Sequence, residues 1–399
     1  MPSPLHAAAL DWLGVHTSEL VGWRRDLHSH PEVGYSEHRT TELIGSVLTG
    51  FGLSPKRLSI GTGVLCDIGD GPEFVALRAD IDALPLPDYK AVSYASLNPG
   101  VCHACGHDVH TAILLAMAGC LAEAGRAGAL GGSVRLIFQP AEERLPGGAE
   151  AAVAEGALQG VTDIFALHCD PKLDVGQIGL RIGPITASCN QIDIKLTGPG
   201  GHTARPQLTT DVVYALGKLI TELPGLLSRR IDPRAAVSLV WGSVTAGSAA
   251  NAIPTAGTLR GTVRMLDDRL WKNLESMVTE LARQIVEPTG VGIEINYDPG
   301  VPAVANDATL VGVQTRAALA AFGPQAVSDT AQSMGGEDFA WYLQTVPGAL
   351  ARLGVRGPGA PLYDLHQSNF DIDEDALAIG VRFTAALLDE YWSGAVKIG

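Results

Sequence analysis

The chain changes its pattern of elements twice, and this limits its fold more than any other feature of the sequence. Up to about residue 167, short apolar runs of strand length alternate with helical segments, as in SVRLIF at 133–138. Between 190 and 297 the order becomes β-α-β-β-α-β, the pattern of a ferredoxin-like unit. After residue 302 the first pattern returns. A chain that leaves one pattern and comes back to it is predicted to carry one domain inserted into another.

We therefore predict an α/β fold. A larger, sheet-centred domain is covered by helices, and a ferredoxin-like α+β domain is inserted into it. Gly and Pro stand side by side at both junctions between the two domains, at 183–184 and 299–300, as is typical of loops. The predicted boundaries are 1–186 and 302–399 for the two parts of the larger domain, and 187–301 for the inserted domain. The length of 399 residues suits two domains, because single domains cluster at ~100–150 residues.

Periodicity and caps predict the individual elements. The expected helices are 7–27, 36–50, 108–125, 209–229 with a Thr cap, 267–287 with an Asp cap, 306–322, 336–344 and 373–392. The expected strands are 64–69, 74–79, 133–138, 162–167, 190–197, 235–244, 255–265 and 291–297.

Charge and cysteine content exclude several classes of function. Lys and Arg number 28 against 43 Asp and Glu, a net charge of −15, so we expect neither nucleic acid nor an anionic membrane as a partner. No apolar run approaches the ~18 residues of a membrane helix, and the start resembles no signal peptide. Six cysteines are too few for a disulfide scaffold. We expect a cytoplasmic protein with free thiols.

The sequence CHACGHDVH at 102–110 is the densest group of side chains able to bind a metal, and it stands at the start of an apolar helix. It has three interpretations. It is a cysteine-containing loop with structural histidines, a CxxC redox pair of Cys102 and Cys105, or a metal site that uses Cys105 and His107. A redox pair needs no histidines, so the metal site is favoured.

Polar residues also follow the expected strands. Glu142 and Glu143 come after strand 133–138, His168 ends the next strand, and Asp82 follows an earlier one. Sites in α/β sheets lie beyond the carboxyl ends of strands, so we expect these side chains to meet. Of two adjacent carboxylates, one can bind metal while the other moves a proton. Asp80, which follows the same earlier strand, and Asp82 can each ligate a metal or orient a ligand histidine.

A further histidine, in LHQSNF at 365–370, precedes the last helix. The whole set is too large for one tetrahedral zinc and suits two metals ~3.5–4 Å apart, with a thiolate as the natural bridge. The candidate ligands are Cys105, His107, Glu143, His168 and His366.

The inserted domain contributes two loops. His202 lies in the glycine-rich stretch GPGGHTARP at 198–206, and Asn251 lies in NAIP at 251–254. Each is either a plain loop or a source of groups that reach a site elsewhere. The functional interpretation of His202 is a donor delivered to an oxyanion when domains or subunits come together.

Taken together, the motifs resemble those of the dinuclear-metal aminoacylase/carboxypeptidase family, in the branch of hippurate hydrolases and indoleacetyl-amino-acid amidohydrolases. Their number and order carry the resemblance from end to end. They are RRDLHSHPEVGYSE at 24–37, LRADIDALPL at 77–86, NPGVCHACGHDVHTA at 98–112, FQPAEE at 138–143, ALH at 166–168, TGPGGHTARP at 197–206, NAIP at 251–254, GGEDFA at 335–340 and LHQSNFDIDEDAL at 365–377.

The resemblance implies a ligand set and an architecture. Cys105 would bridge two metals, His107 and His168 would complete one, and Glu143 and His366 the other. The larger domain would be catalytic, and the inserted domain would serve as a lid and a dimerisation domain.

The resemblance also implies catalytic roles. Glu142 would be the general base and then the general acid, with Asp82 as a carboxylate behind the ligands. His202 would reach the active site of a neighbouring subunit, and Asn251 would contact the substrate or the oxyanion.

Two local departures from the family bear on substrate choice. Arg144-Leu145-Pro146 intervenes between the Glu pair and the glycines that follow it. Residues 367–369 (QSN) replace a His-Pro-like step common in the branch. The first departure bears on the pocket shape and hence on the acyl or side-chain preference.

From this we predict a metal-dependent amidohydrolase that cleaves the amide of N-acyl-amino acids. A metal-activated water would attack the carbonyl carbon, and Glu142 would take its proton. Arg264 or Arg205 would meet the substrate carboxylate. Two divalent ions are expected per chain, zinc or manganese first and cobalt or nickel as alternatives. The expected assembly is a homodimer through the inserted domain, with a tetramer as the alternative.

The alternatives differ in class. A metallo-carboxypeptidase or dipeptidase would use the same site on peptides and would differ only in its pocket. A non-catalytic metal-binding protein would hold the ions without turnover. A redox protein would form a reversible disulfide between Cys102 and Cys105.

Overall fold

The computed structural model describes residues 3–145 and 147–395, which fold into two compact units. Unit 1 comprises the described residues of 1–183, 305–331 and 338–399, and unit 2 comprises Pro184–Val304 and Gln332–Glu337. The inserted domain had been expected as one continuous segment, 187–301. The hexapeptide Gln332–Glu337 instead joins it from far along the chain. Ser333 N donates to Ile185 O (2.9 Å), and Ala187 N donates to Gly335 O (3.2 Å).

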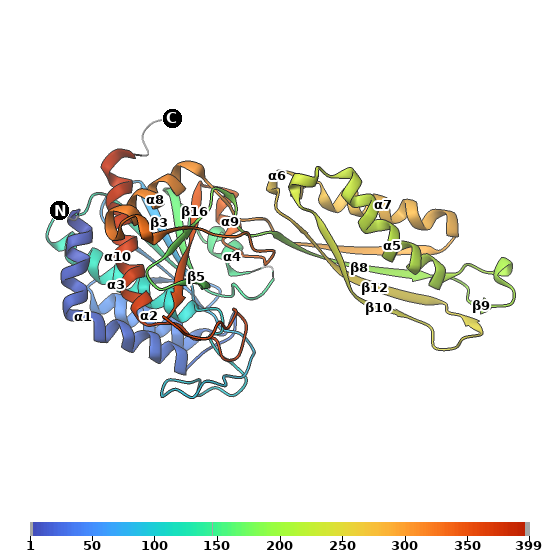
Figure 1. Cartoon of the computed structure of the whole chain (residues 1–399), viewed down its shortest axis with the longest axis horizontal. Helices are drawn as coiled ribbons and strands as arrows, with labels where there is room; N and C mark the ends of the chain where they lie inside the picture. Colours follow the sequence, from blue (N-terminus) through green and yellow to red (C-terminus); the bar gives the residue numbers. More distant parts are fainter. Residues whose placement is uncertain (1–2, 146, 396–399) are drawn as a thin grey trace. The chain divides into compact units, whose positions relative to one another are not determined.

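Unit 1 is built on a mixed sheet (Figure 1). Its strands are β1 (Lys56–Arg57), β2 (Val64–Ile68), β3 (Phe74–Asp80), β4 (Ser133–Gln139), β5 (Val161–Asp174), β6 (Ile178–Leu180), β15 (Val327–Asp329) and β16 (Gly348–Arg356). They lie in the order β1-β2-β4-β3-β5-β16-β6-β15. Neighbours among the central strands β4, β3, β5 and β16 run parallel, so their carboxyl ends point the same way.

Helices cover this sheet. They are α1 (Pro4–Ser29), α2 (His38–Gly50), α3 (His107–Arg126), α4 (Gly148–Ala154), α8 (Ala308–Phe322), α9 (Ala340–Leu343) and α10 (Asp375–Glu390). In Figure 1, α1, α3 and α10 lie to the left of the sheet, and α4 and α9 lie to its right. The large core of unit 1 lies where α1, α3, α8 and α10 pack together and against the strands.

Helix α3 differs from the expectation about membrane-spanning segments. No apolar run of membrane-spanning length had been expected, yet α3 is long and apolar enough by length and composition alone. Nearly all of its apolar stretch is buried, and it packs against α1, α10 and β3. Its composition is therefore that of a core helix, which is hydrophobic on all sides because it is surrounded.

Unit 2 has its own sheet and its own core. Its main elements are β8 (Ser188–Thr197), α5 (Val212–Arg230), β10 (Ser238–Ala246), β12 (Ala256–Met265), α6 (Asp268–Trp271), α7 (Leu274–Val286) and β13 (Gly292–Val301). The antiparallel order β10-β12-β8-β13 is the ferredoxin-like arrangement that the sequence predicted. On β8, Ile192, Ile194 and Leu196 are buried under α5 and α7 while the residues between them are exposed, the period of a half-covered strand.

The remaining elements are short. In unit 2, β9 (Gly201–His202) pairs with β11 (Ala252–Ile253). The strands β7 (Gly183–Pro184) and β14 (Ala305–Asn306) lie where the chain passes from one unit to the other. Single turns occur at Pro206–Leu208, Pro233–Ala235, Glu287–Thr289, Pro324–Ala326 and Tyr391–Ala395.

Some elements differ from expectation for local reasons. Helix α5 is capped by Asp211, whose side chain accepts from Tyr214 N (2.9 Å), and not by a threonine. The helix expected at 267–287 is two helices, α6 and α7, although Asp267 does cap the first. Strand β16 was not foreseen, because GALARLGVR lacks the β-branched run and the alternation of a strand.

Candidate metal centre

The glycine between Cys105 and His107 sets the geometry of the centre. Gly106 has φ 89°, and a Cβ there would lie 2.7 Å from Cys169 Sγ, so only glycine fits this turn. The turn places Cys105 just before α3 and His107 in its first position. Both side chains are buried among unit 1 residues.

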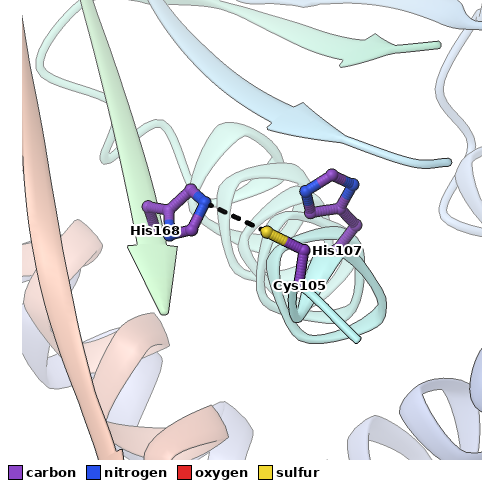
Figure 2. Close-up of side chains that lie close together, drawn as sticks. All are labelled: Cys105, His107 and His168. Carbon is purple, nitrogen blue, oxygen red and sulfur yellow. Dashed lines mark hydrogen bonds between the residues drawn. The ribbon is translucent and has the colours of Figure 1, made fainter. Parts of the chain in front are cut away.

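The first group of potential ligands is Cys105, His107 and His168 (Figure 2). Cys105 Sγ lies 3.5 Å from His168 Nε2. His168 Nδ1 donates to the carbonyl of Cys169 (2.8 Å), and His107 Nδ1 donates to the carbonyl of Asp82 (2.9 Å). Each imidazole therefore keeps Nε2 free to accept, which is the tautomer a metal ligand needs.

The second group is Cys105, Glu143 and His366. Glu143 Oε1 lies 3.1 Å from His366 Nε2. His366 is exposed and has φ 63°, and its N–H donates to Ala104 O (2.8 Å), which ties its loop to the loop of Cys105. The two groups share the Cys105 thiol, so the ligand atoms are arranged as two clusters with one common sulfur.

A metal fits these residues by three observations. The buried atom His107 Nε2 makes no hydrogen bond. A tetrahedral zinc with bonds of ~2.3 Å to sulfur and ~2.0–2.1 Å to nitrogen holds the two ligand atoms about 3.5 Å apart, as Cys105 Sγ and His168 Nε2 are. The combination of thiolate, imidazole and carboxylate is typical of transition metals.

The electrostatics of the centre also favour a cation. Burial opposes protonation of His107, but the carboxylates of Asp80 and Asp82 outweigh it and raise its pKa to about 10. Burial and the carboxylates of Glu143 and Glu142 raise the pKa of the Cys105 thiol well above its usual range. The protein thus gathers negative charge around groups that a divalent ion would satisfy in place of protons.

A layer of buried residues behind the ligands was only partly foreseen. Asp82 was predicted here, and its two carboxylate oxygens accept from Glu142 N and Glu143 N, both at 3.0 Å. His110 was given no role, yet its Nδ1 lies 2.6 Å from Asp80 Oδ1 and its Nε2 accepts from the backbone N–H beside His168. A histidine one turn along from a ligand on a helix is the signal that could have found it.

Glu142 also lies beside the ligands. Its Oε2 is 4.0 Å from His107 Nε2, and its side chain is 9% exposed. After it, Arg144 and Leu145 are exposed, whereas Pro146, part of the departure from the family, lies outside the described residues. The carboxylate is thus close to the potential ligands and only slightly exposed.

The residues predicted from the inserted domain lie in unit 2. His202 and Asn251 are exposed and adjacent, since Thr203 N donates to Asn251 O (3.3 Å). Arg205 is exposed in the same loop. Arg264 is half-buried, and one nitrogen of its guanidinium already donates a hydrogen bond to the carbonyl of Met334.

The redox interpretation is poorly supported by the environment of its cysteines. Burial raises the pKa of Cys102 to about 11, whereas redox-active thiols have a lowered pKa. All six cysteines are free thiols.

Comparison with known proteins gives one family and several relatives. The family described as Peptidase family M20/M25/M40 matches residues 76–390. An N-acetyl-L-cysteine deacetylase of Bacillus subtilis is 36% identical over 90% of this chain and 85% of its own length. The IAA-amino acid hydrolase ILR1-like 4 of Arabidopsis thaliana is 35% identical over 93% of this chain and 85% of its own length.

A longer relative and a solved structure complete the comparison. A Rhodococcus jostii protein named "Putative glutamate--cysteine ligase 2-3" is 46% identical over 92% of this chain, and the chain spans only 46% of that protein. The Bacillus subtilis YXEP protein, described as a dinuclear metal binding peptidase, has a TM-score of 0.81 and 33% identity. That match covers 94% of this chain and 98% of the other.

Proposed function

Because this chain belongs to peptidase family M20/M25/M40, we propose that it is a metal-dependent hydrolase that cleaves the amide bond of N-acyl-amino acids. The observation that carries the proposal is the pair of ligand groups sharing Cys105, with the Glu142 carboxylate beside them. The relatives named for deacetylation and for hydrolysis of amino-acid conjugates support an N-acyl-amino acid as the substrate class.

Two divalent ions are proposed as cofactors, and the dinuclear description of the Bacillus subtilis structure supports that number. Cys105 would be shared, His107 and His168 would hold one ion, and Glu143 and His366 the other. When bound, such ions polarise a carbonyl oxygen and lower the pKa of water. Zinc or manganese suits the ligands best, with cobalt or nickel as alternatives.

Glu142 is proposed to move the proton. Its carboxylate accepts a proton from the attacking water and then delivers it to the leaving amine nitrogen. The backbone N–H of Glu142 is fixed by Asp82, which also accepts from His107 Nδ1 through its carbonyl. Asp82 therefore fixes the positions of both the base Glu142 and the proposed ligand His107, and this supports its assignment as a positioning carboxylate.

Unit 2 is proposed to supply the remaining contacts. His202 would donate to the oxyanion from a partner subunit, and Asn251 would contact the substrate beside it. Two arginines are proposed for the substrate carboxylate. Arg205 is the better candidate because it is exposed, whereas Arg264 already donates a hydrogen bond to the carbonyl of Met334.

A homodimer through unit 2 is proposed on the exposed edge strand β10. Its side chains Val240 and Val244 are 60% and 55% exposed, and Tyr214 on α5 is 60% exposed. An exposed edge strand with apolar side chains is a surface that pairs readily with a second copy. The finding that all six cysteines are free thiols supports a cytoplasmic location. A carboxypeptidase or dipeptidase is the second candidate, favoured by the peptidase description of the Bacillus subtilis structure.

The test is amide hydrolysis by the purified protein on N-acetyl-, N-benzoyl- and indoleacetyl-amino acids and on dipeptides. Each substrate is assayed after chelation and after addition of zinc or manganese, with the Glu142→Ala variant as the blank. Metal-dependent release of free amino acid from acyl conjugates above dipeptides supports the proposal. Faster cleavage of dipeptides supports the second candidate, and turnover by the chelated protein or by the variant contradicts both.

A further inference from the structure

Three consecutive backbone N–H groups next to the base are held by two buried carboxylates. Asp82 accepts from Glu142 N and Glu143 N, each at 3.0 Å. The N–H of Ala141, just before them, donates to Glu37 Oε1 at 2.7 Å. Glu37 is fully buried and precedes α2, more than a hundred residues away in the sequence. No role was predicted for it.

The backbone at Ala141 has a conformation that an alanine does not adopt freely. Its φ is 55°, in the left-handed region, where the Cβ crowds the backbone. A residue in this region persists only where its surroundings determine it, and such residues gather at functional sites. The hydrogen bond from Ala141 to Glu37 is one such determinant, and it acts one residue before the base.

Gly34 and Tyr35, just before Glu37 in the sequence, also contact the loop that carries Glu142. A Cβ on Gly34 would lie 3.0 Å from Ala141 Cα and 3.2 Å from Asp82 Oδ2, so the chain packs directly on the turn. The Tyr35 hydroxyl donates to Gly147 O (3.0 Å), on the far side of the two glutamates. The segment from 34 to 37 therefore holds the loop of Glu142 at both of its ends.

We propose that Glu37 is a positioning residue for the reaction, which holds Ala141 in the left-handed turn and so aims the carboxylate of Glu142. This inference rests on the proposed function of Glu142 as the base. Without Glu37, the buried N–H of Ala141 loses its acceptor, and the turn loses one of the contacts that keep its unfavourable φ. Relaxation there rotates the next residue, and a displacement of ~1 Å at a reacting group lowers turnover by about 10²-fold.

The experiment compares Glu37→Ala with Glu37→Gln in protein loaded with metal. Glutamine keeps an acceptor oxygen at the same reach, whereas alanine removes it. Glu37→Ala is expected to lower kcat about 10- to 100-fold, with KM and metal content near those of the wild type. Glu37→Gln is expected to stay within about 3-fold of the wild type, since the acceptor remains.

Glu32→Ala is the matched control. Glu32 is half-buried and lies just before the segment from 34 to 37, and its carboxylate also accepts backbone N–H groups, those of Arg39 (3.1 Å) and Thr40 (2.8 Å). Its removal loosens the start of α2 without touching the turn of Ala141. The inference requires kcat per folded, loaded molecule to be retained in this variant. An equal loss in Glu32→Ala and Glu37→Ala would mean a general structural role and would overturn it.

A second pair of variants keeps the inference testable if Glu37→Ala folds poorly. Glycine adopts φ 55° without steric penalty, so Ala141→Gly is expected to reduce the loss caused by Glu37→Ala when the two are combined. Gly34→Ala presses on Ala141 while leaving Glu37 intact, and it is expected to lower kcat as well. The inference would be overturned if Gly34→Ala kept full activity and the double variant Glu37→Ala/Ala141→Gly lost as much activity as the two single variants together.

Failure of the proposed function has a different signature. In that case the wild type itself releases no amino acid from any amide substrate with any metal. If the wild type is active and Glu142→Ala is not, but Glu37→Ala retains full kcat, the function stands and only the role of Glu37 is wrong.

Discussion

Cys105 Sγ and His168 Nε2 lie 3.5 Å apart, although 63 residues separate them in the sequence. The thiol stands before helix α3 and the imidazole on strand β5. The same sulfur belongs to the group formed with Glu143 and His366. Both groups of ligands therefore depend on one atom.

Replacing this cysteine should affect both metal sites together. In Cys105→Ser the bound metal is expected to fall below one ion per chain, and turnover is expected to drop at least ~100-fold, because a hydroxyl is a poor substitute for a thiolate. Cys189→Ser is the control, since Cys189 is a free thiol in unit 2. Metal content by elemental analysis decides. Two ions retained in Cys105→Ser would exclude a shared thiolate.

The proposed role of His202 across subunits predicts complementation between inactive chains. His202→Ala and Glu142→Ala are each expected to be inactive, while dimers formed from both contain one site with an intact base and an intact donor. Random exchange makes half of the dimers mixed, so activity is expected to return to about a quarter of the wild-type level. The measurement is turnover after the two variants are unfolded and refolded together. If His202 acts on its own chain, the mixture stays inactive.

A buried ion-pair network predicts unequal effects for two adjacent arginines. Arg24, 1% exposed, bonds Asp108 (2.9 Å) and Asp371 (2.7 Å), whereas Arg25, 46% exposed, bonds Glu374. Arg24→Met leaves the buried Asp108 without its main cation and should lower the free energy of unfolding by about 3–5 kcal/mol. Arg25→Met should lower it by less than about 1 kcal/mol. Urea denaturation of both variants checks this, and equal losses would contradict it.

Glu37 predicts a pH dependence of stability in the metal-free protein. Burial and the nearby charge of Asp82 raise the pKa of Glu37 to about 7, from a usual value near 4.5. A raised pKa stabilises the folded state most below pH 4.5, and this contribution is lost as pH rises to about 7. Relative to Glu37→Gln, which does not titrate, the wild type should therefore lose up to about 3 kcal/mol over this range. A constant difference between the two proteins across the range would show that Glu37 keeps its usual pKa.

Residues whose chemistry is unusual could be recognised without coordinates. Cys105 and His107 stand out because a cysteine and a histidine flank a glycine at the start of an apolar helix, and Glu143 because paired carboxylates follow a strand. Unit 2 was readable from its β-α-β-β-α-β order, which the sheet β10-β12-β8-β13 confirms.

Other features depend on contacts that no local pattern encodes. Glu37 acts on a turn more than a hundred residues away, and a single glutamate in a loop has no distinguishing signal. Strand β16 forms because β5 and β6 flank it, and its alanines and glycines gave no strand propensity of their own. The hexapeptide Gln332–Glu337 joins unit 2 through backbone hydrogen bonds, which are indifferent to side-chain type.

That hexapeptide has a consequence for how this protein can be taken apart. Because the chain leaves unit 1 at 184 and again at 332, unit 2 is not a cassette that can be removed or exchanged by cutting at two points. A gene fusion that transplants only residues 184–304 would leave the hexapeptide behind and deprive Ile185 and Ala187 of their backbone partners. A transplanted unit 2 should therefore be stable only when residues 332–337 are supplied together with residues 184–304.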